Sequence, residues 1–294
     1  GGIPAPRGAV FTQEMCEGGS GMGDYYKQKY GTDLFILNIP FLDTQSHREY
    51  LKEQYFQLFK WIQNYTGKPF SMEKLVEALR LYNMAREYWI KCIELQKDGP
   101  FISSAHFSNL FRFTFFFGTQ FGLDITKRFY EQLLEAKEKA PVTERSKKKK
   151  RILWNHFMPM YDPELIEYME KELNCWIVMD FVGYLHWPEY DLDTPVESLV
   201  LRSLSNVIMG ELEMREKRIS RVVKEFKIDG IVNFMHNGCR AIPSLSWQFR
   251  DVADKLGIAY LELTGDNIDP RGYSPQQTRL RLEAFKEALY RGGF

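Results

Sequence analysis

The strongest constraint on the fold is an alternation of short apolar segments with helical patterns along the second half of the chain. Segments typical of strands occupy Arg151–Phe157, Cys175–Phe181, Gly230–Met235 and Ile258–Leu263. A period of 3.6 residues predicts helices at Asp162–Leu173, Thr194–Phe226, Pro243–Leu256 and from Ser274 or Pro275 to Tyr290. Strands that alternate with helices pair in parallel, with helices on both faces of the sheet. This half is therefore predicted to be a flavodoxin-like, doubly wound α/β domain.

The first half is predicted to open with one parallel β-α-β unit and to continue into helices. Its strands are expected at Gly8–Gln13 and Asp33–Phe41, with a glycine-rich loop at Glu14–Gly21 and a short helix at Gly23–Tyr30 between them. Gly18–Gly23 lacks the Gly-Lys-Ser/Thr ending of a phosphate-binding loop. Further helices are expected at Ser46–Leu95, broken at Gly67–Pro69, and at Asp98–Phe121 and Asp124–Lys139.

Chain length and one polar stretch predict two domains. The 294 residues suit two cores rather than one. Lys137–Arg151 contains almost nothing that a core could bury, and we interpret its run Lys147–Lys150 as a solvated linker rather than a phosphate-binding patch. The expected domains are an N-terminal α/β domain with a helical layer, residues 1–145, and the C-terminal flavodoxin-like α/β domain, residues 146–294.

Charge, hydropathy and cysteine spacing exclude several classes of protein. Lys+Arg and Asp+Glu are equal at 39 each, so no overall field favours nucleic acid or an anionic membrane. No run approaches the roughly 18 apolar residues that span a bilayer. The four cysteines form no CxxC pairs, which argues against a zinc ribbon or a disulfide scaffold and favours a cytoplasmic setting. The first residue is not Met and no signal peptide is recognisable, so we expect an N-terminally truncated piece of a longer subunit.

Two of the four cysteines occupy positions where parallel sheets bind ligands. Cys16 and Cys239 each follow a predicted strand and precede a predicted helix, whose N-terminus stabilises a thiolate. Cys92 lies inside a helical pattern, and Cys175 starts a strand at the opposite edge. Position alone leaves two interpretations open for Cys16 and Cys239, because a buried cysteine is often a small apolar filler.

Motifs at both ends of the chain resemble one family. In the first half, Cys16-Glu17 after a strand and then Phe35–Phe41 are similar to that family's earlier cysteine loop and next strand. The more specific signature comprises His236-Asn-Gly-Cys-Arg240, Gly257–Leu263, Asp266–Arg271, Gln277, Arg279 and Glu283–Phe285. Together they resemble the 2-hydroxyacyl-CoA dehydratase D-component family, which also holds benzoyl-CoA reductase subunits and double-cubane cluster proteins. The aromatic middle of the chain carries none of these motifs.

The resemblance implies a [4Fe-4S] cluster at the interface of two related α/β domains. Three cysteines would hold it and leave one iron open to substrate, and Cys16 and Cys239 match two of these ligands. The third is expected further upstream than the 15 residues that precede Cys16. Either the chain is truncated, or another group replaces this ligand; the placement of Cys92 and Cys175 argues against them.

The same resemblance implies an iron-sulfur subunit of an ATP-activated radical acyl-CoA enzyme. A separate ATP-hydrolysing iron-sulfur activator would deliver one electron, and the thioester carbonyl would become a ketyl radical during loss of water from an (R)-2-hydroxyacyl-CoA. A homologous sister subunit would complete a heterodimer. The alternatives are a dearomatising benzoyl-CoA-type reductase, a double-cubane reductase and a cluster-free scaffold subunit. A flavin- or nucleotide-binding protein is disfavoured because GxGxxG is absent.

Polar residues near the predicted cysteine loops have two interpretations each. His236 is expected either to donate to the cluster or a thioester oxygen, or to cap backbone. Arg240 pairs with a cluster sulfur or a CoA phosphate, or with the following helix. Glu17 is a further candidate neighbour of the cluster or substrate. Asp266–Arg271 lies at the same edge but is also ordinary turn chemistry.

Overall fold

The chain forms two compact units, each assembled from several stretches of sequence. The computed structural model describes residues 4–13, 17–108, 110–139, 148–181, 188–206, 209–241 and 243–291. The first unit comprises residues 1–80, 187–211 and 238–241, and the second comprises 81–186, 212–237 and 242–294. The boundary predicted between residues 145 and 146 lies outside the described residues and stays a prediction. Within the described ranges, no helix combines the length and the apolar character that crossing a bilayer requires.

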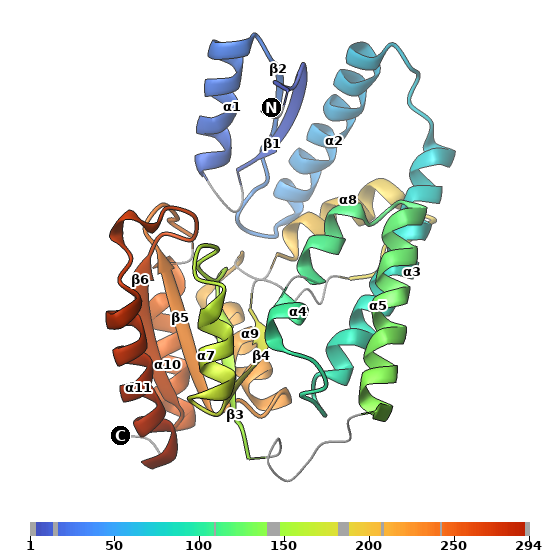
Figure 1. The fold of residues 1–294 in the computed structure, drawn as a ribbon. Coiled ribbons are helices and arrows are strands. Elements are labelled where there is room, and N and C mark those ends of the chain that lie inside the picture. Colours follow the sequence, from blue (N-terminus) through green and yellow to red (C-terminus); the bar gives the residue numbers. More distant parts are fainter. Residues whose placement is uncertain are drawn as a thin grey trace. The chain divides into compact units, whose positions relative to one another are not determined.

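The second unit is built on a parallel four-stranded sheet (Figure 1). Its strands are β3 (Lys150–Asn155), β4 (Cys175–Asp180), β5 (Gly230–His236) and β6 (Ala259–Gly265). They lie in the order β4-β3-β5-β6, and every neighbouring pair is parallel. Counted along this half, the order is 2-1-3-4, the start of the flavodoxin-like order. All four predicted strands are confirmed, with ends that differ by at most two residues.

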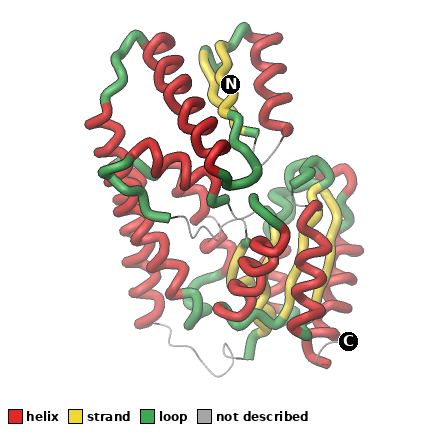
Figure 2. The backbone as a smooth tube through the Cα atoms, turned by 180° about the vertical axis from the view of Figure 1, so that it is seen from behind, coloured by secondary structure: helices red, strands yellow, loops and turns green. Residues whose placement is uncertain are grey.

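Helices cover both faces of this sheet (Figures 1 and 2). They are α7 (Glu164–Lys171), α9 (Leu212–Glu225), α10 (Ser246–Leu256) and α11 (Pro275–Arg291), with short 3-10 turns η2 (Pro243–Leu245) and η3 (Pro270–Gly272). Val232 and Phe234 pack into one core with α7 and α11. Asn233 points to the other face, where it hydrogen-bonds Ser246 of α10. The strand sequences are continuous apolar runs because both faces of the sheet are buried.

The aromatic middle of the chain is less helical than its length suggested. The second unit also contains the later part of α3 (Met72–Leu95), α4 (Ser104–Ser108), the 3-10 helix η1 (Leu110–Phe116) and α5 (Gln120–Lys139). The single helical segment predicted over Asp98–Phe121 is therefore wrong. Phe111, Phe113, Phe115 and Phe116 cannot share one face of an α-helix, and Phe115 remains 73% exposed.

The first unit contains the predicted β-α-β unit, with a longer helix than expected. Strands β1 (Gly8–Thr12) and β2 (Asp33–Leu37) pair in parallel, and α1 (Glu17–Tyr30) connects them. The glycine-rich loop predicted at Glu14–Gly21 is wrong from Glu17 onward, since α1 starts there. A Cβ at Gly19 would lie 3.2 Å from the backbone oxygen of Thr12 and one at Gly23 3.1 Å from Leu34, so glycine permits the helix to pack closely on the strands.

Two further helices complete the core of the first unit. Helix α2 (Gln45–Thr66) ends at Gly67, as predicted, and α3 begins at Met72. Helix α8 (Pro195–Leu204) packs against α2, and the hydroxyls of Tyr55 and Ser203 lie 2.6 Å apart. This core consists of Leu37, Ile39, Leu51, Tyr55, Val196, Val200 and Leu204.

The continuous helix predicted over Thr194–Phe226 is wrong, because α8 and α9 are separate. Between them Met209 N–H bonds Asn206 O at 3.0 Å, and Gly210 N–H bonds Phe41 O at 3.2 Å. These turn and tertiary hydrogen bonds replace the helical i to i−4 pattern. The α/β class with parallel sheets is thus confirmed. Two flavodoxin-like domains remain a prediction, since the described part of the first unit has a two-stranded sheet.

Candidate functional site

The carboxyl ends of β3 and β5 form the topological switch point of the second unit's sheet. These strands are neighbours, but the chain continues from β3 to β4 on one side and from β5 to β6 on the other. The loops that leave adjacent strands therefore diverge and open a crevice, where ligands of doubly wound sheets bind. The crevice is bordered by residues that follow Asn155 in β3, His236 in β5 and Gly265 in β6.

Two histidines stack at this switch point. The rings of His156 and His236 are 5.5 Å apart between centroids and inclined by only 15°. His156 directly follows β3 and has a φ of 76°, a left-handed conformation uncommon for a residue with a Cβ. The turn carries its ring to the edge of the sheet, where it is 8% exposed. Sequence reasoning missed His156 because the predicted strand ran through it to Phe157.

The environment keeps His156 neutral. Burial first, and then the adjacent His236, lower the pKa of His156 to about 4, against a smaller opposite contribution from the Asn267 side chain. An imidazolium in this position would lose its hydration without gaining a carboxylate partner. At neutral pH His156 therefore acts as a polar but uncharged ring.

His236 accepts a hydrogen bond from the backbone of the next strand's loop. The Asn267 N–H donates to His236 Nδ1 at 3.3 Å, and the nearest Asp266 carboxylate oxygen lies 3.6 Å from the same nitrogen. An accepting Nδ1 assigns the proton to Nε2 in the neutral ring. His236 thus has a backbone-capping contact and retains an Nε2–H donor.

The loop after β6 is held by its own turn chemistry and by the loop after β3. Asp266 Oδ1 accepts the backbone N–H groups of Ile268 and Asp269, each at 2.8 Å, and these bonds are the main cause of the lowered Asp266 pKa. The Met160 N–H donates to Asn267 O at 2.8 Å, and the Tyr161 hydroxyl donates to Asp266 O at 2.6 Å. The two loops therefore brace each other beside the histidines.

A buried polar network links the end of β3 to the middle of β5. Asn155 Nδ2 donates to Asn233 Oδ1 at 2.7 Å, and Asn233 Nδ2 donates to the hydroxyls of Ser246 and Tyr260 at 2.6 and 3.0 Å. The Tyr260 hydroxyl in turn donates to Glu262 at 3.0 Å. Both asparagines are completely buried. Such a network fixes the two strands in one arrangement.

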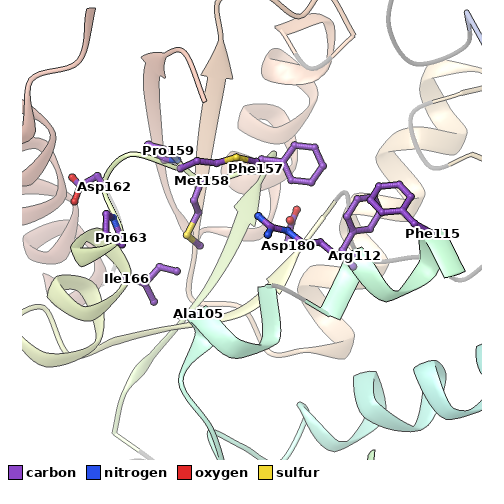
Figure 3. A pocket seen from close by; sticks show the side chains of 12 residues that line it. Ala105, Arg112, Phe115, Phe157, Met158, Pro159, Asp162, Pro163, Ile166 and Asp180 are labelled. Carbon is purple, nitrogen blue, oxygen red and sulfur yellow. The ribbon is translucent and has the colours of Figure 1, made fainter. Parts of the chain in front are cut away.

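A mostly apolar cavity of about 410 Å³ opens in the second unit beside the carboxyl ends of β3 and β4 (Figure 3). It is lined by residues 157–160 after β3, by the start of α7, by Asp180 at the end of β4 and by the aromatic segment around η1. Its Phe157 ring contacts His156 at 5.3 Å between centroids. The volume falls within the range of small-molecule sites.

The described cysteines differ sharply in their surroundings. Cys239 is half-buried and lies three residues after β5, in the stretch assigned to the first unit. Cys92 is fully buried, and Cys175 starts β4 at the opposite edge of the sheet. Burial raises the pKa of Cys175 to about 12 and that of Cys92 further still, which disfavours the thiolate that a metal ligand requires.

The other predicted site residues are only partly described. Cys16 lies outside the described residues, and Glu17 begins α1. Arg240 is exposed in the same loop as Cys239. In the part of the chain that the structure describes, no group of three or more His, Cys, Asp and Glu side chains could hold a metal ion. Of the described cysteines, Cys239 is the one that follows the carboxyl end of a strand.

Comparison with known proteins points to one family. Its model, 2-hydroxyglutaryl-CoA dehydratase, D-component, matches residues 2–289. The chain is 22% identical to the lactoyl-CoA dehydratase subunit alpha of Anaerotignum propionicum, over 86% of this chain and 62% of that protein. It is 20% identical to the (R)-phenyllactyl-CoA dehydratase alpha subunit of Clostridium sporogenes and 24% identical to the (R)-2-hydroxyisocaproyl-CoA dehydratase alpha subunit of Clostridioides difficile. Each match covers 98% of this chain and 72% of the relative.

The coverage and identity of these matches establish the family but not the substrate. The chain spans between 62% and 72% of the length of these three relatives. Identity of 20–24% is too low to carry over an acyl group. The family match nevertheless covers almost the whole sequence and includes both motif regions. The chain therefore belongs to the 2-hydroxyglutaryl-CoA dehydratase D-component family.

Proposed function

We propose that this chain is the iron-sulfur subunit of an ATP-activated radical acyl-CoA enzyme that removes water from an (R)-2-hydroxyacyl-CoA. The observation that carries this proposal is the family match over residues 2–289. The relatives' names support it, since they are alpha subunits of dehydratases for three different acyl-CoA thioesters. A dearomatising benzoyl-CoA-type reductase and a double-cubane reductase are the alternatives within the same chemistry.

The proposed cofactor is a [4Fe-4S] cluster held by Cys16, Cys239 and a third ligand outside the described residues. Two features support Cys239: its place after the carboxyl end of β5 and its partial exposure. When bound, such a cluster supplies low-potential one-electron chemistry. We propose that two flavodoxin-like α/β domains flank it.

The chain's own polar groups would bind and orient the thioester. His236 has an Nε2–H that can donate to the thioester oxygen, because its Nδ1 already accepts the Asn267 N–H. Neutral His156 stacks on His236 and would hold that ring in place without adding a charge. Arg240 is exposed and suits a CoA phosphate, and Glu17 is a further candidate neighbour of the bound substrate.

The proposal includes protein partners. The three relatives are named alpha subunits, which supports a homologous sister subunit in a heterodimer. A separate ATP-hydrolysing iron-sulfur activator would deliver the electron, and the assembly would work in the cytoplasm. A cluster-free scaffold subunit is the alternative from another class of protein.

The decisive experiment measures iron, acid-labile sulfide and the visible spectrum of anaerobically purified protein. It uses the longest natural chain that contains this sequence. We expect about four irons per chain, the content of one [4Fe-4S] cluster. Cys239→Ser and Cys16→Ser should each lower the iron content severalfold, because each removes a thiolate ligand.

Cys175→Ser is the matched control, since its thiol is buried at the far edge of the sheet. It should keep its iron. An iron-free natural chain, or a Cys239→Ser variant that keeps its full iron content and spectrum, would overturn the cluster assignment and favour the scaffold.

A further inference from the structure

The walls of the cavity beside β3 and β4 are mostly apolar. Phe157, Met158, Pro159 and Met160 contribute from the loop after β3. Figure 3 shows Pro163 and Ile166 of the α7 region on one side, and Phe115 on the other. Thioethers and aromatic edges adapt to the shape of an apolar group and attract it by dispersion. These walls favour a hydrocarbon occupant.

The charged side chains around the cavity supply no buried cation for a carboxylate on an occupant. The Asp162 side chain is 9% exposed, and the Tyr273 hydroxyl donates to it at 2.6 Å. Asp180 is a second lining carboxylate. Arg112 also lines the cavity but is exposed, so its charge is largely screened by water. Asp162 is also paired with the Arg279 guanidinium, 3.9 Å away. A carboxylate on the occupant would lose its hydration against the apolar walls without gaining a buried cation among the lining residues.

A continuous row of aromatic rings joins this cavity to the switch point. The Phe111 and Phe157 rings are 5.5 Å apart between centroids, Phe157 and His156 are 5.3 Å apart, and His156 and His236 are 5.5 Å apart. A group in the cavity would therefore lie next to the end of β3, two ring contacts away from His236 at the end of β5. This arrangement suits a molecule whose apolar end is held in the cavity and whose polar end reaches the histidines.

We propose that the cavity binds the acyl side chain of the substrate thioester, and that this side chain is apolar, either branched aliphatic or aromatic. The inference rests on the proposed function and narrows its substrate class. It excludes substrates with a carboxylate at the far end of the acyl chain. It also assigns a specificity-determining position to Ala105, which lies in the cavity wall.

The test measures binding of four saturated CoA thioesters by calorimetry, on the protein in the assembly in which it purifies. The set is propionyl-, 4-methylpentanoyl-, 3-phenylpropanoyl- and glutaryl-CoA. We expect the 4-methylpentanoyl and 3-phenylpropanoyl thioesters to bind about tenfold or more tightly than the propionyl thioester, because each adds several buried carbons. Glutaryl-CoA should show no gain over propionyl-CoA.

A space-filling variant links this preference to the cavity. Ala105→Phe should remove the preference for the two larger acyl groups, because the phenyl ring would occupy the volume that they fill. Ala284→Phe is the matched control, because Ala284 is exposed on α11. This variant should bind the four thioesters with the same preference as the unmodified protein. The thermal unfolding temperature of each variant reports whether it is folded.

The possible results separate this inference from the proposed function. If all four thioesters bind within about twofold of one another, or glutaryl-CoA binds most tightly, the protein is an acyl-CoA binder and the inference is wrong. If Ala105→Phe is folded and keeps the preference, the apolar site lies elsewhere and the inference is wrong. If none of the thioesters binds, the proposed function itself fails.

Discussion

At the scale of single residues, the histidine pair shows how local geometry sets chemistry. His156 leaves the sheet with a positive φ and becomes buried against His236. Burial is the larger cause of its pKa of about 4, and the neighbouring ring adds to it. The unfolded chain has no such environment, so its histidines protonate near 6.5. This difference makes the stability of the fold depend on pH.

We predict that His156 destabilises the folded protein as the pH falls from about 6.5 towards 4. Over this range the unfolded chain binds a proton at His156 that the folded chain does not, so the free energy of unfolding decreases. The loss should reach about 2 kcal/mol between pH 7 and pH 5. His156→Asn should remove this contribution, since asparagine tolerates a positive φ and does not titrate.

Urea unfolding at the two pH values measures this effect as a difference between the variant and the unmodified protein. His106→Asn is the matched control, because His106 is exposed in α4 and its replacement should leave the pH dependence unchanged. Equal pH dependence in His156→Asn and the unmodified protein would show that His156 is protonated normally in the fold.

At the scale of elements, the strands of the second unit were the most predictable and the loops around glycines the least. A continuous apolar run such as Cys175–Asp180 reflects burial on both faces and can be recognised without tertiary information. Helix α1 was partly missed because Gly18, Gly19 and Gly21 have low helix propensity. What stabilises it is close packing on β1 and β2, which sequence periodicity does not reveal.

We predict that Gly21→Ala stabilises the protein by about 0.5–1 kcal/mol. Gly21 is exposed inside α1, and a Cβ there would meet nothing within 4 Å, so alanine restricts the unfolded chain without a clash. Gly31→Ala is the matched control and should destabilise by about 1 kcal/mol, because Gly31 ends α1 with a φ of 65°. Urea titrations followed by circular dichroism compare the two, and a loss of stability in Gly21→Ala would contradict the helical assignment.

At the scale of the whole molecule, the edge of the sheet could be predicted but the residues that meet there could not. Parallel alternation was enough to place the loop of Cys239 at the carboxyl ends of the strands. The pairing of His156 with His236 depends on which strands are neighbours, and the order β4-β3-β5-β6 does not follow from sequence order. The cavity likewise combines residues from η1, α7 and the strand ends, which periodicity cannot bring together.

The two sheets should differ greatly in their resistance to local opening. Strand β5 is buried along most of its length and pairs with β3 on one side and β6 on the other. Most residues of β1 and β2 are partly exposed, and their sheet has two strands in the described part of the chain. Two-stranded sheets are only marginally stable without further packing. The rate of amide hydrogen exchange reports the free energy of each local opening. We predict that β5 amides exchange through openings at least about 2 kcal/mol costlier than those of β1 and β2. Native-state hydrogen exchange measures this difference, and equal protection would mean that both units open only in one cooperative unfolding step.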